Sequence, residues 1–283
     1  MFEVQWPLVL FSFLAGLGGF ALASAALSGI LGKGGDNPRF VTTVIAIACM
    51  VIGGCCSMLH LAVVENVMAA VTNILSFSGI SIELVLLGTT CIVALIYAIM
   101  LKRDTSETAR KVVAVLCIIA GVLLAFFCGH GYVMDGRPLW NTELLPLAYL
   151  GTAFGAGALL FATIQRAMGE PAEVICGLRV WILVGALLSL ITVAAYVIYL
   201  GSQGALEGEA PTFAIVAIAG ALAALGCAIV LVRPGVETSV GIAVVALVCA
   251  VAAGVGLRML MWAASTGYLD LFEVAMTTRT WMF

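Results

Sequence analysis

The chain has 283 residues, of which 64% are hydrophobic and only 10% are charged, and its mean hydropathy is +1.22. A soluble domain carries about 25% charged residues, so the charges here are too few to cover a water-soluble protein of this size. Most of the surface must therefore face the lipid bilayer. The net charge of −3 argues against nucleic acid as a partner.

Eight apolar runs are long enough to cross a bilayer as helices, which takes about 20 residues each. Strands of a β-barrel would be about half as long and would alternate apolar with polar residues, a pattern absent here. The sequence predicts one all-α transmembrane domain over residues 1–283, a polytopic bundle of eight helices. The predicted spans cover residues 6–31, 40–61, 80–101, 112–132, 144–164, 174–200, 213–232 and 240–262.

The distribution of Lys and Arg predicts the orientation, because cytoplasmic loops are enriched in both. Arg137 and Arg279 lie on one side of the predicted bundle, and Arg258 lies within the last span. The other side holds Lys33, Arg39, Lys102, Arg103, Arg110, Lys111, Arg166, Arg179 and Arg233. We expect a multi-pass protein of the cytoplasmic (inner) membrane with this basic side in the cytoplasm, and hence both termini outside.

Four ionisable side chains fall near the outer ends of four different predicted spans. His60 closes the second span, Glu83 lies one turn into the third, His130 closes the fourth, and Arg258 lies about one turn from the end of the eighth. Ionisable groups are costly within a membrane and suggest function. The alternative without a function is that each side chain extends its polar group to the membrane–water interface.

Oxidation of a lipid-soluble quinol would use such a set. The reaction releases two protons, so it calls for bases close to water: a neutral imidazole that accepts a hydrogen bond, and a carboxylate that carries the proton away. His60 and Glu83 are the candidate catalytic residues, and Arg258 would orient the carboxylate or keep it charged. Further polar candidates for orienting the quinol are Asn73, Tyr132 and Arg137.

Three other functions stay open. His60 and His130 at similar depth could hold a single b-type haem, although no histidine lies at the inner side for a second one. A transporter would place polar groups near the midplane, where this chain is almost wholly apolar. A purely structural anchor would have no quinol site. The nine cysteines show no CxxC spacing, and we expect neither a metal site nor an iron–sulfur cluster within the chain.

Short motifs, in order along nearly the full length, resemble the membrane anchor of the dimethyl sulfoxide reductase family of molybdoenzyme complexes. The strongest is Ser57-Met58-Leu59-His60-Leu61, followed by Asn73 and Glu83. The others are Trp6-Pro7-Leu8, Tyr132 with Pro138, Trp140 and Pro146 leading into residues 155–160, and Gly254-Val255-Gly256-Leu257-Arg258. His130 and Val63-Val64-Glu65 depart from the family pattern.

The resemblance implies a membrane anchor that binds no haem and oxidises menaquinol to menaquinone during anaerobic respiration. Electrons would pass to a four-cluster iron–sulfur subunit and then to a molybdopterin catalytic subunit, which reduces a terminal acceptor such as a sulfoxide or an N-oxide. The chain would carry half of a redox reaction and no complete activity alone. His60 matches the family's quinol-binding histidine, and Glu83 is its expected acidic partner.

Overall fold

The computed structural model describes residues 4–59, 79–234 and 239–264. Within these ranges all regular elements are helices, and eight of them are long and apolar enough to span a membrane, which confirms the predicted fold class. The spanning helices are α1 (Trp6–Ile30), α2 (Asp36–Met58), α4 (Gly79–Lys102), α5 (Glu107–His130), α6 (Leu144–Ala167), α8 (Arg179–Ser202), α9 (Ala210–Leu231) and α10 (Val240–Ala263), and a short helix, α7 (Ala172–Gly177), precedes α8.

The predicted helix starts were late wherever the first turn is polar. α2 begins at Asp36 and α5 at Glu107, several residues before the apolar runs. An acidic first turn suits the positive end of the helix dipole, and Ser106 caps α5 by accepting a hydrogen bond from the Ala109 N–H at 3.2 Å. The predicted span at 174–200 is wrong at its start, because its first residues belong to a separate short helix. That helix ends at Gly177 and the spanning helix begins at Arg179, since Leu178 leaves helical geometry with φ −108° and ψ 11°.

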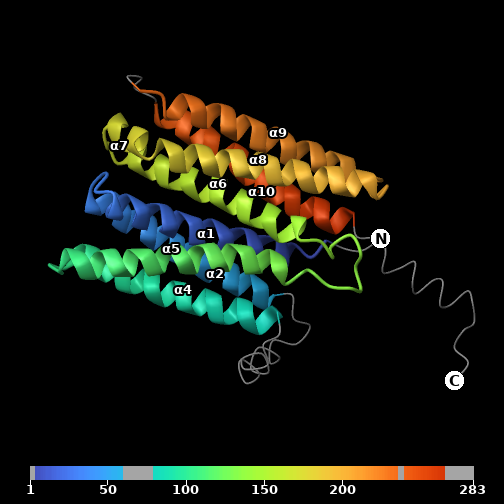
Figure 1. Ribbon diagram of the computed structural model, residues 1–283, viewed down its shortest axis with the longest axis horizontal. Coiled ribbons are helices and arrows are strands. Elements are labelled where there is room, and N and C mark those ends of the chain that lie inside the picture. The colour runs from blue at the N-terminus through green and yellow to red at the C-terminus, as the bar shows by residue number, and fades with distance from the viewer. Residues whose placement is uncertain (1–3, 60–78, 235–238, 265–283) are drawn as a thin grey trace, which may run out of the picture.

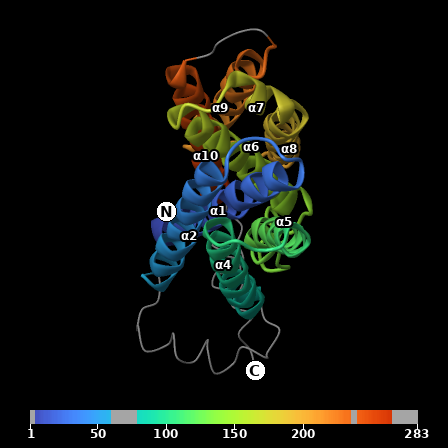
Figure 2. The same ribbon diagram turned by 90° about the vertical axis from the view of Figure 1, so that its left-hand side faces the viewer.

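The helices form two groups of four that meet along α1 and α6 (Figures 1 and 2). One group contains α1, α2, α4 and α5, and the other contains α6, α8, α9 and α10. Glycine allows close contact at the seam: a Cβ on Gly157 of α6 would lie 2.6 Å from the Ala21 backbone nitrogen of α1. α1 and α6 are thus buried along most of their length, whereas the outer helices expose apolar side chains such as Val180 and Ile198.

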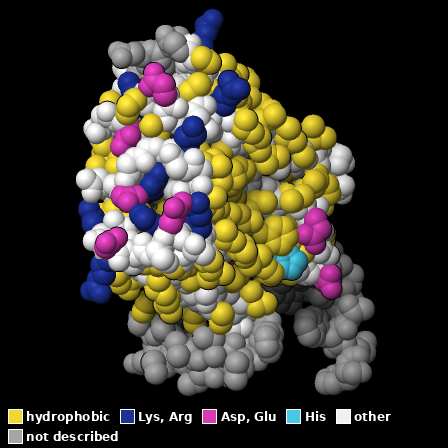
Figure 3. All heavy atoms as spheres, turned by 60° about the vertical axis from the view of Figure 1, so that its left-hand side comes forward, with side chains coloured by type: hydrophobic (Ala, Val, Ile, Leu, Met, Phe, Trp, Pro, Cys, Tyr) yellow, Lys and Arg dark blue, Asp and Glu magenta, His cyan; other side chains and the backbone are white. Residues whose placement is uncertain are grey.

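One end of the bundle holds all nine basic residues assigned to a single side from the sequence. We call it the basic end; it comprises the connections 31–35, 103–106 and 168–178 and residues 232–234, with the adjoining helix ends, at the left of Figure 1. Figure 3 shows Lys, Arg, Asp and Glu side chains gathered over this end, beside a broadly hydrophobic flank. The connections 131–143 and 203–209 lie at the opposite end. Which end faces the cytoplasm stays a prediction.

Candidate functional site

The predicted site residues that the structure describes all lie at or near the opposite end. Glu83 is in the first turns of α4, His130 is the last residue of α5, and Tyr132 and Arg137 follow in the connection to α6. Arg258 lies five residues before the end of α10, as its number and the helix bound at Ala263 show. His60 and Asn73 lie outside the described residues.

Arg258 is the most buried charged side chain among the described residues, with 0% of its surface exposed. Its guanidinium joins three helices. Nε donates to the Ser12 hydroxyl of α1 at 3.0 Å, and Nη1 donates to the Gly254 carbonyl of α10 at 2.8 Å and to the Thr152 hydroxyl of α6 at 3.4 Å. Nη2 donates to the Ser12 carbonyl at 3.2 Å. Arg258 therefore points into the seam between the two groups of helices, not toward lipid.

Aromatic rings complete the surroundings of this guanidinium. Its central carbon lies 4.1 Å from the ring centre of Tyr149 and 5.3 Å from that of Phe13, distances typical of cation–π contacts. In the part of the chain that the structure describes, no carboxylate forms an ion pair with Arg258. Within the described residues, hydrogen bonds and ring faces hold the charge, with no carboxylate paired to it.

Glu83 is held against the backbone that leaves α5. A Cβ built on Gly131 would collide with the Glu83 carboxylate oxygen, so only glycine leaves room for this approach. No ion pair with Glu83 occurs within residues 4–59, 79–234 and 239–264.

Three side chains lie within electrostatic range of both Glu83 and Arg258: Cys128, Tyr132 and Tyr149. Tyr132 lies outside the helices, and burial together with the nearby Tyr149 and Glu83 raises its pKa well above its usual value. Its hydroxyl therefore stays protonated at neutral pH and can donate a hydrogen bond. Glu83, Arg258 and these three side chains form what we call the acid–arginine cluster.

An aromatic layer lies at this end of the bundle and includes Tyr132 of the acid–arginine cluster. Trp140 and Trp262 meet edge to face with ring centres 5.0 Å apart, and Tyr132 lies 5.7 Å from Trp140 and 6.3 Å from Trp262. Trp140 is anchored by its indole N–H, which donates to the Met261 carbonyl at 3.0 Å. Arg137 lies over the Trp140 ring at 3.9 Å. Tyr132 and Arg137 thus belong to one aromatic layer, and their role in a quinol site stays a prediction.

His130 lies two residues from both Cys128 and Tyr132, and its ring packs on its own helix. Its ring stacks on Phe126 and meets Phe127 edge-on, with ring centres 5.8 and 5.7 Å away, both about one turn or less back on α5. Its Nδ1 is buried and finds no hydrogen-bond partner among the described residues. Within the described residues, no group of three or more His, Cys, Asp or Glu side chains could hold a metal ion.

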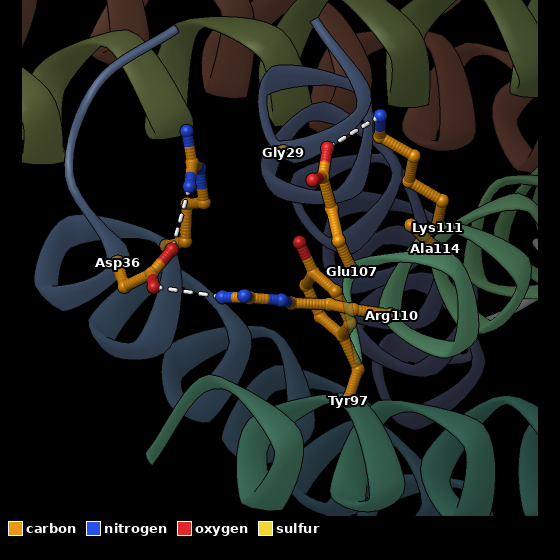
Figure 4. Close-up of a pocket in the computed structure, with 8 residues that line it drawn as sticks. Gly29, Asp36, Tyr97, Glu107, Arg110, Lys111 and Ala114 are labelled. Atoms are coloured by element: carbon orange, nitrogen blue, oxygen red, sulfur yellow. Dashed lines mark hydrogen bonds and ion pairs between the residues drawn. The ribbon is translucent and has the colours of Figure 1, made fainter. Parts of the chain in front are cut away.

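Sequence reasoning missed the polar groups around Arg258 and a second polar assembly at the basic end. There, Asp36 accepts from Arg39 at 2.6 Å and from Arg110 at 2.8 Å, which ties α2 to α5 beside a cavity of about 260 Å³ (Figure 4). Glu107 pairs with Lys111 at 2.6 Å. In the sequence analysis Arg39, Arg110 and Lys111 served only to predict which side of the bundle faces the cytoplasm. Nothing in the sequence indicated that Arg39 would be buried.

The fold and the polar end together define a class: a membrane protein with eight spans in the described residues, in which a buried arginine lies in the seam between two four-helix groups. Residues 3–266 match the family model described as polysulphide reductase, NrfD, so the chain belongs to that family. Members of the family are membrane subunits of molybdoenzyme complexes and assemble with iron–sulfur and molybdopterin catalytic subunits. Comparison with curated proteins found no match.

The family match confirms the coarser part of the predicted resemblance, a membrane anchor of a molybdoenzyme complex. The dimethyl sulfoxide reductase type stays a prediction.

Proposed function

We propose that this chain is the quinol-oxidising anchor of a molybdoenzyme complex and that menaquinol is oxidised at the acid–arginine cluster. The observation that carries the proposal is a chain of contacts between the two groups of helices. Glu83 of α4 lies against Gly131, the ring centre of the next residue, Tyr132, lies 5.8 Å from that of Tyr149, and Arg258 of α10 lies over the Tyr149 ring at 4.1 Å. An acidic side chain, a neutral phenol and an arginine with no carboxylate partner among the described residues are groups suited to quinol deprotonation.

The chemistry assigns each side chain a separate role. Oxidation of menaquinol to menaquinone releases two protons and two electrons. Glu83 accepts one proton from a quinol hydroxyl and His60 accepts the other, while the Tyr132 hydroxyl donates a hydrogen bond to a quinol oxygen as negative charge develops there. Arg258 is a positioning residue that acts through Tyr149, because its own donors are occupied by Ser12, Thr152 and Gly254. His60 and Asn73 complete the proposed set.

The electrons leave for the iron–sulfur subunit, and the protons leave to the exterior. This direction assumes that the basic end faces the cytoplasm, as the enrichment of Lys and Arg in cytoplasmic loops supports. The partner subunits would then dock on the opposite end, near the aromatic layer. A sulfoxide or N-oxide is the proposed terminal acceptor, and polysulphide is the second candidate because the family's description names it.

The test is quinol oxidation by the assembled complex carrying Glu83→Gln. The amide keeps the shape of the carboxylate but cannot accept a proton, so the rate should fall by about 10²–10⁴-fold, the usual contribution of a general base. Glu207→Gln is the matched control, because Glu207 is exposed in the connection between α8 and α9 at the same end. Unchanged oxidation in both Glu83→Gln and His60→Ala complexes would refute the site.

A further inference from the structure

An apolar groove opens between α1 and α8 near the basic end, far along the helices from the acid–arginine cluster. α1 and α8 both pack on α6, which leaves a space of about 360 Å³ between their ends at the basic end. Leu27 and Leu31 line it from α1, Phe154 from α6, and Val180, Trp181 and Val184 from α8. This volume falls in the range of small-molecule sites, about 300–1,000 Å³.

The polar groups at the groove wall are already satisfied. The Trp181 indole N–H donates to the Ser24 hydroxyl at 2.9 Å, and that hydroxyl donates to the Phe20 carbonyl at 2.7 Å. The Trp181 and Phe154 rings lie 4.3 Å apart and present apolar faces. A ligand that needs hydrogen bonds within the groove, such as a quinone ring, would gain none from these groups. A hydrocarbon chain would gain by burying apolar area.

Two cations stand at the mouth of the groove. The Lys33 side chain lies across Gly177, so closely that a Cβ there would be 3.0 Å from the lysine Cδ. Arg179 directly precedes Val180, and both residues are exposed. Neither cation forms an ion pair in the described part of the chain. An apolar channel with free positive charges at its membrane-surface end matches an acyl chain carrying an anionic headgroup.

We propose that this groove is a binding site for one acyl chain of an anionic phospholipid, whose phosphate rests on Lys33 and Arg179. A lipid bound there would fill the space that the two groups of helices leave open where they meet. The proposal does not depend on the quinol site, which lies at the other end of the bundle.

Quenching of Trp181 fluorescence by brominated acyl chains tests the proposal. The full chain is placed in vesicles of phosphatidylglycerol and phosphatidylcholine, with bromine either on the phosphatidylglycerol chains or on the phosphatidylcholine chains. The signal of a Trp181→Phe variant is subtracted from each. Brominated phosphatidylglycerol should quench Trp181 more strongly. The preference for phosphatidylglycerol over phosphatidylcholine should fall by roughly fivefold in Lys33→Gln or Arg179→Gln, and again by that factor in the double variant. In the control variant Arg233→Gln the preference should be unchanged.

A second variant tests the groove itself. Val184→Phe places a ring in the space and should lower quenching of Trp181 by either lipid. Val244→Phe is the control, because Val184 and Val244 are similarly exposed, at 41% and 42%. Equal quenching by the two lipids, or displacement of the brominated lipid by a short-chain quinone, would overturn the proposal.

Discussion

The guanidinium carbon of Arg258 lies 4.1 Å from the ring centre of Tyr149, at a place where the described chain offers no carboxylate partner. An arginine in this setting keeps its charge because it cannot readily lose a proton. Four hydrogen bonds to α1, α6 and α10 hold it in place. The structure thus keeps a fixed positive charge inside the membrane, which the proposed function uses to favour loss of a proton from quinol.

Arg258→Met should lower quinol oxidation more than stability. Ser12 and Thr152 keep hydrogen bonds to the Val9 and Ala148 carbonyls of their own helices, so the variant strands neither hydroxyl. We expect the complex to assemble and the rate to fall by roughly tenfold or more, equivalent to a loss of about 1.4 kcal/mol or more of transition-state stabilisation. Rate and thermal unfolding midpoint are measured together.

Arg39→Met is the matched control at the basic end and should behave in the opposite way. Arg39 is 7% exposed and donates to the Asp36 carboxylate and to three backbone carbonyls. Its loss should reduce stability by about 2–3 kcal/mol, typical of a lost charged hydrogen-bond network, without a specific effect on quinol oxidation. A folded but normally active Arg258→Met complex would exclude a role for Arg258 in the reaction.

Gly131→Ala should impair the reaction by moving Glu83. The new methyl group would occupy the position of the carboxylate oxygen, so the carboxylate must shift. A displacement of about 1 Å can cost around 100-fold in rate. Gly136→Ala lies in the same connection with nothing within 4 Å of its Cβ position, and its rate should be normal. Equal rates for the two complexes would show that Glu83 needs no such placement.

Trp140→Phe should destabilise the opposite end more than Tyr199→Phe does. Each change removes one hydrogen bond to a backbone carbonyl: Trp140 to Met261 at 3.0 Å in the interior, and Tyr199 to Pro138 at 3.1 Å at the surface. Water can replace the second but not the first, so we expect a difference of about 1–2 kcal/mol between them. Thermal unfolding in detergent measures both, and the reverse ranking would contradict the buried anchor.

Asp36→Asn should be more damaging than Glu107→Gln. Asp36 holds two arginines and ties α2 to α5, whereas Glu107 pairs only with Lys111 one turn away. Solvent screens the exposed Glu107–Lys111 pair, so it contributes little, and loss of Asp36 should cost several times as much. Urea or thermal unfolding of the two variants at low and high salt supplies the comparison, and similar losses would mean that Asp36 contributes no more than a surface charge.

The purified protein should show no Soret band. The resemblance implies an anchor that binds no haem, and the His130 ring packs on Phe126 and Phe127 of its own helix. An absorption spectrum decides the matter, and a Soret band lost in His130→Ala would establish the single-haem cytochrome instead.

The sequence predicted the number of helices well because the spans are almost uniformly apolar and are separated by polar or glycine-bearing connections. The predicted starts of α2 and α5 were too late, because a hydropathy profile does not detect the polar first turns that begin at Asp36 and Glu107. Glu83 and Arg258 could be recognised because ionisable residues in spans are rare.

The partners of these charges could not be predicted. Ser12, Thr152 and Tyr149 look ordinary in an apolar helix, and their role depends on the rotation of α1 and α6 about their axes. In the same way, the sequence showed Arg39 only as a basic residue beside a span, although the packing of α1 on α2 buries it. Long-range geometry of this kind leaves no local pattern in the sequence.

Photolabelling of the intact complex with an azido-quinone analogue tests the central claim most directly, because it reports where the ring binds. Mapping the labelled peptides should place the label on residues 79–90 and 128–149, around Glu83, Tyr132 and Tyr149, with excess menaquinol suppressing it. Label confined to residues 27–31 and 177–184, at the groove near the basic end, would contradict the proposed site of quinol oxidation.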